Sequence, residues 1–180
     1  MSSLAAHLLI SSAGLHDPNF RHTVVVIGVH GEEGAVGVIL NRPTDLRVAE
    51  AVPALAGLTE PGAMLFEGGP VQPNQPVVLA ELDAAVRADI PVVGNIGFLT
   101  GEIDATYRPS ILRGRVFAGY SGWGPGQLEA ELAEDAWIVD PALPEDVFTD
   151  RPESLWRRVL ERKGGEYRRV SMVPKDPRMN

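Results

Sequence analysis

Four histidines and several carboxylates are the side chains whose types allow chemistry in this chain. None of His7, His16, His22 and His30 is spaced as H-x-x-x-H or H-E-x-x-H, so no metal site is encoded locally. The chain has no cysteine, which removes thiolate ligands and cysteine nucleophiles. His16, Asp17 and His22 flank one loop and could converge there, although solvent-facing turn histidines are the simpler interpretation. We expect neither a metal nor a cofactor.

A serine in a glycine-rich segment is the candidate nucleophile. Ser121 lies in Gly119–Trp123, where tryptophan stands in place of the last glycine of a G-x-S-x-G motif. A strand-to-helix turn is predicted there, which would expose the hydroxyl. No histidine follows Ser121, as the order serine, acid, histidine requires. The sequence therefore disfavours an acyl-transfer triad.

Two acidic positions are candidates for binding or acid–base work. Gln127 and Glu131 lie four residues apart on one predicted helix face, which is more often simply solvated. Glu67 enters the turn Gly68-Gly69-Pro70, where bare backbone permits close approach of a ligand or of another chain segment.

The aromatic residues next to the glycine-rich segment suggest a pocket wall. Tyr120 and Trp123 stand among three glycines. The alternative for Trp123 is core packing, with its indole N–H bonded to a backbone carbonyl.

Composition limits the class of protein. The chain has 180 residues, 44% of them hydrophobic and 22% charged, as in one soluble domain spanning residues 1–180. Its net charge of −8 argues against a broadly basic nucleic-acid binder. No apolar run approaches the roughly 20 residues of a membrane-spanning helix, and no basic residue precedes the N-terminal apolar patch. We expect a cytoplasmic protein without membrane contact.

A β-hairpin is the best-defined predicted element. Thr23–Val29 and Ala35–Leu40 are rich in β-branched residues and flank a polar, glycine-containing turn. Further strands are predicted at residues 8–12, Met64–Phe66, Pro76–Ala80, Val92–Leu99, Arg115–Tyr120 and Ala136–Val139.

Three helices are predicted among these strands. One follows an Asp45 cap and runs to Leu55, shortened or kinked by Pro53; one begins after the glycine-rich segment; and the last covers Pro152–Lys163. Thr100–Ser110 is predicted to be a loop, and the tail from Val173 a strap over the surface. Without regular βαβ alternation, this order predicts an α+β fold with a largely antiparallel sheet.

Charge is distributed unevenly along the chain. Residues 151–180 carry a net charge of +5, whereas residues 1–150 carry −13. The last predicted helix and its extension contribute a candidate anion-binding patch, formed by Arg157, Arg158, Arg162 and Lys163, with Arg168 and Arg169 beyond. An intramolecular or solvated role is the alternative to an external anion.

Four motifs in order resemble the YqgE/AlgH family of bacterial proteins. They are His16–Phe20, Gly34–Pro43 (GAVGVILNRP), Glu67–Val71 (EGGPV) and Gly119–Leu132 (GYSGWGPGQLEAEL), the last followed by Ala136-Trp137. They define a motif core of about residues 8–140, followed by the basic helix and tail at 151–180. The chain departs from the family pattern in a short 101–110 segment and over its last 40 residues.

The resemblance implies an α+β fold in which a bifurcated sheet curls into a pseudo-barrel with flanking helices. Some family members are labelled transcriptional regulators, and no catalytic residue is established that could be carried over. The motif loops would then form a binding pocket from His16, Asp17, Asn41, Arg42, Glu67, Gly68, Gly69, Tyr120, Ser121, Trp123, Gln127 and Glu131.

Three functions remain open at this point. A non-enzymatic regulatory protein that binds a protein or a small molecule is favoured. An enzyme with its site at the motif loops comes second, and direct DNA binding through the basic helix comes third, disfavoured by the net charge. The sequence does not indicate an oligomeric state.

Overall fold

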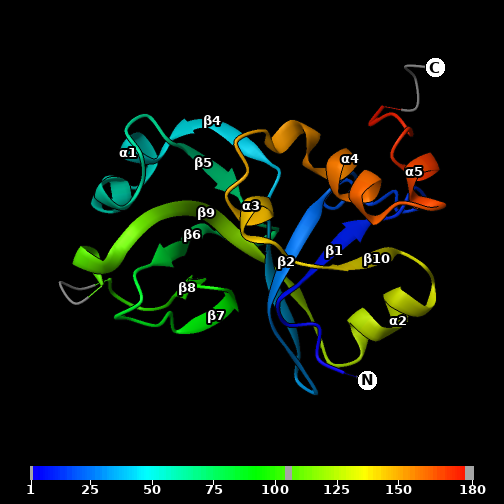
Figure 1. Cartoon of the computed structure of the whole chain (residues 1–180), viewed down its shortest axis with the longest axis horizontal. Coiled ribbons are helices and arrows are strands. Elements are labelled where there is room, and N and C mark those ends of the chain that lie inside the picture. The colour runs from blue at the N-terminus through cyan, green and yellow to red at the C-terminus, as the bar shows by residue number, and fades with distance from the viewer. Residues whose placement is uncertain (1, 104–106, 177–180) are drawn as a thin grey trace.

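Ten strands form one sheet that divides into two arms (Figure 1), in a computed structural model that describes residues 2–103 and 107–176. The main path runs β10-β1-β2-β3-β9-β6-β8-β7, while β4 pairs with β5 and β5 pairs with β9. The strands are β1 His7–Ser11, β2 Val24–Gly31, β3 Gly34–Ile39, β4 Pro43–Arg47, β5 Met64–Glu67, β6 Val71–Leu82, β7 Ile90–Val93, β8 Ile96–Leu99, β9 Ile111–Trp123 and β10 Trp137–Pro141. All pairings are antiparallel except that of β5 with β9.

The long strand β9 joins the two arms. Its last residues, Ser121–Trp123, pair with β3, whereas its earlier residues pair with β6 on one side and β5 on the other. Gly119 marks the change of partner, with φ of 71°. A Cβ there would lie 2.7 Å from the carbonyl oxygen of Gly69, so the branch point requires glycine.

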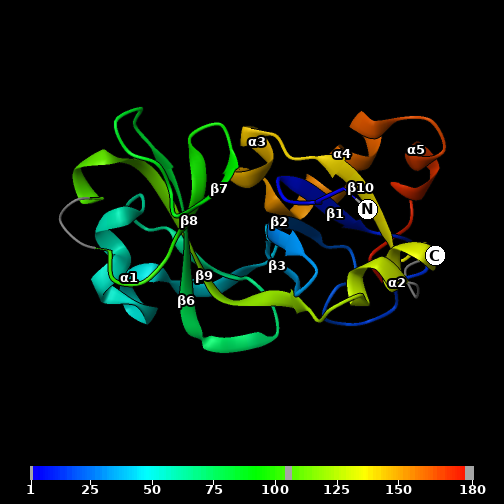
Figure 2. The ribbon, with the colours of Figure 1, turned by 90° about the horizontal axis from the view of Figure 1, so that it is seen from below.

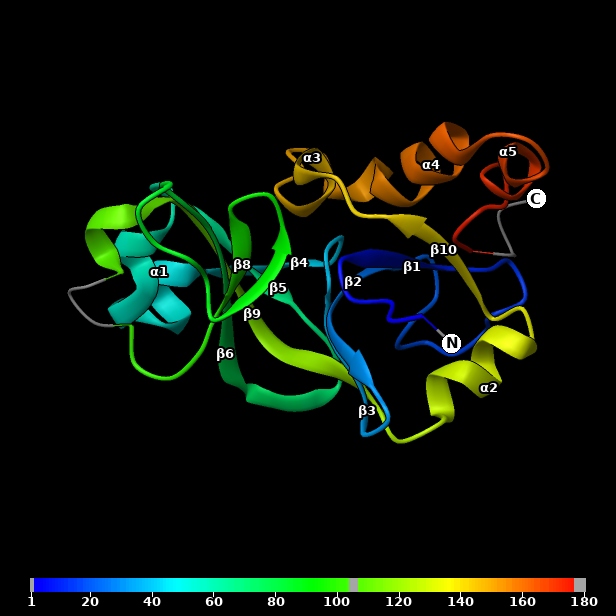
Figure 3. The same ribbon diagram turned by 60° about the horizontal axis from the view of Figure 1, so that its bottom comes forward.

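In the arm built from β10, β1, β2 and β3, the central strands β1, β2 and β3 are buried on both faces over most of their length, which explains their continuous apolar runs. Leu8 and Ile10 face helix α4 (Pro152–Lys163), whereas Leu9 between them faces helix α2 (Gln127–Ala133). Figure 3 shows α4, with the short helix α5 (Tyr167–Val170), on one side of this arm and α2 on the other.

The other arm curls around a second core. Strands β5, β6, β8 and β9 pack their apolar side chains against helix α1 (Val48–Ala51) and the 3-10 helix η1 (Pro53–Leu58). Figure 2 shows this arm as a separate lobe of the sheet, joined through β9 to the strands under α4. The α+β fold with a bifurcated, largely antiparallel sheet is confirmed.

Several predicted elements are confirmed. The β2–β3 hairpin pairs Val25 with Ile39 and closes at Gly31 and Gly34, and α4 has the predicted bounds. The strands predicted at 8–12, 64–66, 76–80, 115–120 and 136–139 fall within β1, β5, β6, β9 and β10 or within a residue of their ends.

Two predicted elements differ from the structure in secondary structure or in extent. Residues 45–47 belong to β4 and not to a helix; α1 is a single turn, and Pro53 begins η1. Residues 92–99 form the end of one strand and the whole of the next, because Gly94 (φ 55°) turns the chain between β7 and β8.

The remaining segments are short. Helix α3 (Pro144–Val147) and α5 have no counterpart among the predicted helices, and the 3-10 helix η2 (Arg108–Ser110) ends the predicted loop. Residues 104–106 of that loop and 177–180 of the tail lie outside the described residues. No helix in the described part of the chain is long and apolar enough to cross a membrane.

Candidate functional site

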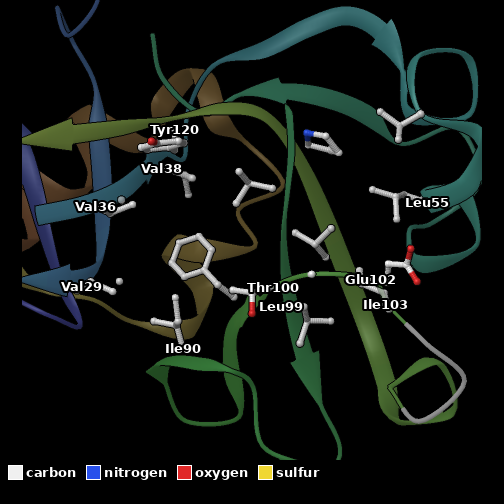
Figure 4. A pocket seen from close by; sticks show the side chains of 18 of the residues that line it. Val29, Val36, Val38, Leu55, Ile90, Leu99, Thr100, Glu102, Ile103 and Tyr120 are labelled. Carbon is white, nitrogen blue, oxygen red and sulfur yellow. The ribbon is translucent and has the colours of Figure 1, made fainter. Parts of the chain in front are cut away.

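A cavity of about 630 Å³ opens where the two arms of the sheet face each other. Its walls come from β2 and β3 of one arm, from β6, β7, β8 and β9 of the other, and from the segments around η1 and η2. Figure 4 shows Val29, Val36 and Ile90 toward one end, Leu55, Glu102 and Ile103 toward the other, and Tyr120 above them. The volume is in the range of small-molecule sites in proteins.

Two glycines allow close packing at this cavity. A Cβ on Gly28 of β2 would lie 2.6 Å from the Phe98 ring of β8, so the bare backbone makes room for a ring of the other arm. Gly37 of β3 permits close approach within one arm, because its Cβ would lie 2.3 Å from the Val26 carbonyl oxygen of the neighbouring strand β2. Both glycines line the cavity, and their lack of side chains helps define its shape.

Most of the lining is aliphatic. The apolar side chains are Val29, Val36, Val38, Val52, Ala54, Leu55, Pro76, Val77, Val78, Ile90, Phe98, Leu99 and Ile103. Such walls favour a ligand that is itself largely apolar, because burial of apolar surface is the main favourable contribution to binding.

Four lining residues carry polar groups: Thr100, Glu102, Arg108 and Tyr120. The Thr100 amide donates to Asp89 Oδ2 at 2.8 Å, and Arg108 Nη2 donates to the Ala54 carbonyl at 3.3 Å. These bonds fix segments that line the cavity, while the polar side chains offer a ligand a few orienting contacts. The Thr100 amide and the Tyr107 hydroxyl together hold the pKa of Asp89 below its ordinary value.

One end of the cavity carries exposed apolar side chains. Val29 and Val36 face each other across the β2–β3 hairpin and are 46% and 43% exposed. They extend the apolar lining to the surface, so a ligand meets an apolar entrance before it reaches the interior.

Tyr120 is the one residue of the predicted pocket set that lines this cavity. The other motif residues lie in separate networks, which join elements of the fold. Sequence reasoning missed the rest of the lining, because it comes from strands that are far apart in the chain and whose apolar patterns resemble ordinary core.

Arg42 anchors the loop before β2. Its guanidinium donates to the carbonyls of Pro18 at 3.0 Å and Arg21 at 3.2 Å, and also to that of Asn19. Burial lowers the pKa of Arg42, and Glu67, 3.9 Å away, opposes this shift. The network therefore draws together the first three motifs of the sequence.

Gly68, Gly69 and Ser121 form a close crossing of β9 and the turn after β5. A Cβ on Gly68 would lie 2.2 Å from the Gly119 carbonyl oxygen, and one on Gly69 2.2 Å from that of Tyr120. The close approach predicted at this turn is thus made by the protein's own strand. Ser121 is fully buried in β9 and donates to the Gly68 carbonyl at 3.0 Å, so the prediction of an exposed hydroxyl on a turn is wrong.

Glu131 is bound by two tryptophans. Its Oε2 accepts the indole N–H of Trp123 at 2.9 Å and that of Trp137 at 2.7 Å, while Oε1 accepts from Gln127 at 2.9 Å. Phe20 packs against both indoles. The expectation of a solvated acidic face at Glu131 is wrong, as is a backbone partner for the Trp123 indole.

The two loop histidines, His16 and His22, lie in different surroundings. His16 and Asp17 are exposed, and Asp17 accepts from the Asn19 amide at 2.9 Å. His22 is partly buried and lies flat on Trp156, with ring centroids 3.9 Å apart. Asn41 fixes this position, because its side chain bonds the His22 carbonyl and the Val24 amide.

The basic helix is largely neutralised or bonded within the molecule. Arg162 forms two 2.8 Å bonds to the buried carboxylate of Asp146, which, with the nearby charge of Asp140, raise its pKa. Lys163 contacts Asp140 at 3.3 Å, and Arg158 donates to Thr149 at 2.6 Å. Arg157 remains exposed.

Metal ligands do not cluster in the described structure. Within residues 2–103 and 107–176, no three histidine, aspartate or glutamate side chains lie together as a metal site.

The fold and cavity together define a class: an α+β protein whose split antiparallel sheet encloses an apolar pocket between its arms. The chain belongs to the AlgH-like family, whose sequence profile matches residues 8–168. That match extends past residue 140, where the recognised motifs end, and includes all of α4.

Relatives match over nearly the whole chain. A UPF0301 protein of Streptomyces avermitilis is 40% identical over 187 aligned positions, covering 100% of this chain and 97% of its own length. The solution structure of the AlgH protein from Pseudomonas aeruginosa has a TM-score of 0.73 at 29% identity, over 96% of this chain and 95% of that one. A crystal structure from Corynebacterium diphtheriae has a TM-score of 0.85 at 24% identity, over 96% and 94% of the two chains, which supports the fold.

Proposed function

We propose that the protein is a non-enzymatic, cytosolic binding protein with a regulatory role, and that it takes up a small, largely apolar molecule between the arms of its sheet. The observation that carries the proposal is the cavity of about 630 Å³ with its aliphatic lining. In such a protein occupancy of the pocket is the activity, and its effect passes to a partner through the surrounding surface.

The arrangement of the lining supports a ligand with an apolar body and a small polar group. Aliphatic side chains form most of the wall, whereas Glu102 and Arg108 contribute charge only toward the η1 and η2 end. Medium-chain fatty acids and alcohols have this character, and they serve as probes of it. Tyr120 adds one polar contact from β9.

A fluorescent apolar probe tests the proposal. N-phenyl-1-naphthylamine becomes more fluorescent in apolar surroundings, so we expect saturable binding to the purified protein and displacement by decanoate or decanol. Val36→Phe places a bulky aromatic ring at the entrance of the cavity and should weaken probe binding by about tenfold, which corresponds to about 1.4 kcal/mol.

Leu112→Phe is the matched control. Leu112 is 64% exposed on β9 and does not line the cavity, so the same enlargement there should leave probe affinity unchanged. Both variants should melt near the temperature of the original protein. Absence of saturable binding, or equal weakening by both substitutions, would overturn the proposed pocket.

A further inference from the structure

A second hollow lies between α4, the loop before β2 and the chain that follows α5. It has a volume of about 350 Å³, and we call it the His22 hollow. Its lining consists of His22, Asn41, Glu153, Ser154, Trp156, Arg157, Ser171, Val173, Pro174 and Lys175. None of these residues lines the apolar cavity, so the two sites are independent.

The His22 hollow carries an excess of positive charge. Arg157 from α4 and Lys175 from the tail line it, against the single carboxylate of Glu153. Arg21 stands next to His22 and adds a further positive charge close by. Both Arg157 and Lys175 have exposed side chains that can reach an incoming anion.

Arg157 differs from the other cations of α4. Arg162 and Lys163 meet the carboxylates of Asp146 and Asp140, and Arg158 is bonded to Thr149, Ser154 and a backbone carbonyl. Within the described residues no ion pair or hydrogen bond is found for the Arg157 guanidinium. It therefore keeps its five donors for a ligand, and guanidinium matches the geometry of phosphate.

The floor of the hollow is held in place. His22 stacks on Trp156 with 14° between the ring planes, and Trp156 is itself fixed by donating to the Ser11 carbonyl at 2.9 Å. His22 has φ of 51°, which a non-glycine residue seldom adopts. Asn41 Nδ2 supports this conformation by donating to the His22 carbonyl at 2.8 Å. These contacts hold the imidazole in place in the hollow that Arg157 and Lys175 also line.

Positive charges near the hollow also act on the pKa of His22. Burial lowers the pKa of His22, and the positive charges of Arg21 and Lys175 lower it further. An anion bound in the hollow would relieve the repulsion.

We propose that the His22 hollow binds the phosphate group of a small phosphate ester. Arg157 and Lys175 supply the charge and the donors, while the volume of about 350 Å³ leaves room for a small organic substituent beside the phosphate. The proposal does not depend on the apolar cavity or on its ligand.

NMR titration of the full chain tests it with two probes, inorganic phosphate and glycerol 3-phosphate. We expect both to shift the His22 ring resonances saturably, with the ester bound more tightly, and to raise the His22 pKa. Arg157→Gln and Lys175→Gln should each weaken glycerol 3-phosphate binding by at least about fivefold. The His22 ring should remain stacked on Trp156 in both variants.

Arg47→Gln is the charge-matched control, because Arg47 is exposed on β4 and does not line the hollow. It should bind glycerol 3-phosphate as the original protein does. Equal weakening by Arg47→Gln and Arg157→Gln would mean a general charge effect and would overturn the proposal. It would also be overturned if a short DNA duplex bound more tightly than the ester and lost affinity in the same Arg157 and Lys175 variants, since the hollow would then serve nucleic acid.

Discussion

Trp123 donates its indole N–H to Glu131 Oε2 at 2.9 Å, and the same oxygen accepts the indole of Trp137 at 2.7 Å. One carboxylate thus joins the end of β9, helix α2 and strand β10. Glu131→Leu removes the acceptor for two buried indole groups and should lower the free energy of unfolding by about 2–4 kcal/mol. Urea denaturation followed by tryptophan fluorescence measures the loss.

Glu131→Gln separates the hydrogen bonds from the charge. It keeps one acceptor oxygen, so it should cost clearly less than Glu131→Leu. Glu161→Ala, an exposed position on α4, should change stability by less than about 0.5 kcal/mol. A Glu131→Leu protein as stable as the Glu161→Ala control would show that the two indoles do not need this carboxylate.

Gly68→Ala tests the crossing of β9 and the turn after β5. The new Cβ would lie 2.2 Å from the Gly119 carbonyl oxygen, and both sides of that contact are backbone, which cannot move aside cheaply. We expect the free energy of unfolding to fall by about 1–3 kcal/mol. Gly31→Ala is the control, because a Cβ on Gly31 would have no neighbouring atom within 4 Å and its φ is not positive. Equal stability of the two variants in thermal melts would contradict the close crossing.

Arg42→Ala should loosen the loop at residues 17–21. The guanidinium bonds three carbonyls of that loop, and no other side chain replaces those donors in the structure as described. We expect faster hydrogen exchange at the amides of Phe20 and Arg21, and little rescue by Arg42→Lys, since lysine lacks the planar fork. Arg47→Ala should leave these exchange rates unchanged; unaltered rates in Arg42→Ala would rule out the anchor.

Periodicity and turn chemistry predict most of the fold. The β2–β3 hairpin and α4 have strong local signals, β-branched strands around a glycine turn and an amphipathic helix that ends at Gly164. Leu46, Ala49, Val52 and Leu55 fit helical spacing and so predict a helix at 45–55, but pairing of β4 with β5 decides the structure at 45–47 and limits α1 to one turn. Gly94 fits a bulge in the sequence, and only the pairing of β7 with β8 identifies it as a turn.

The candidate site is harder to predict. Ile90 and Phe98 look like core residues in the sequence, and their place in a cavity depends on how β7 and β8 face β2. In the sequence the motif residues resemble a site, because glycine, tryptophan and acidic residues stand close together. In the structure they join elements of the fold: the Gly68 carbonyl accepts the Ser121 hydroxyl, and Glu131 accepts the Trp123 indole N–H. Tyr120 belongs to both sets, since it follows the branch glycine on β9 and faces the cavity.

His22 should make stability depend on pH. Burial, Arg21 and Lys175 lower its pKa below 6.5, and among the charged groups lining the same hollow, Arg157 opposes its protonation while Glu153 favours it. The unfolded chain then takes up a proton near pH 6.5 that the folded protein takes up only at lower pH, so stability is full above pH 6.5 and falls as the pH drops below it.

His22→Gln removes this contribution, so its unfolding free energy should decline less between pH 7.5 and about pH 5 than that of the original protein. His16→Gln, at an exposed histidine of the same loop, is the control and should keep the original pH dependence. Identical curves for His22→Gln and the original protein in chemical denaturation would show that the stacked imidazole is not the titrating group.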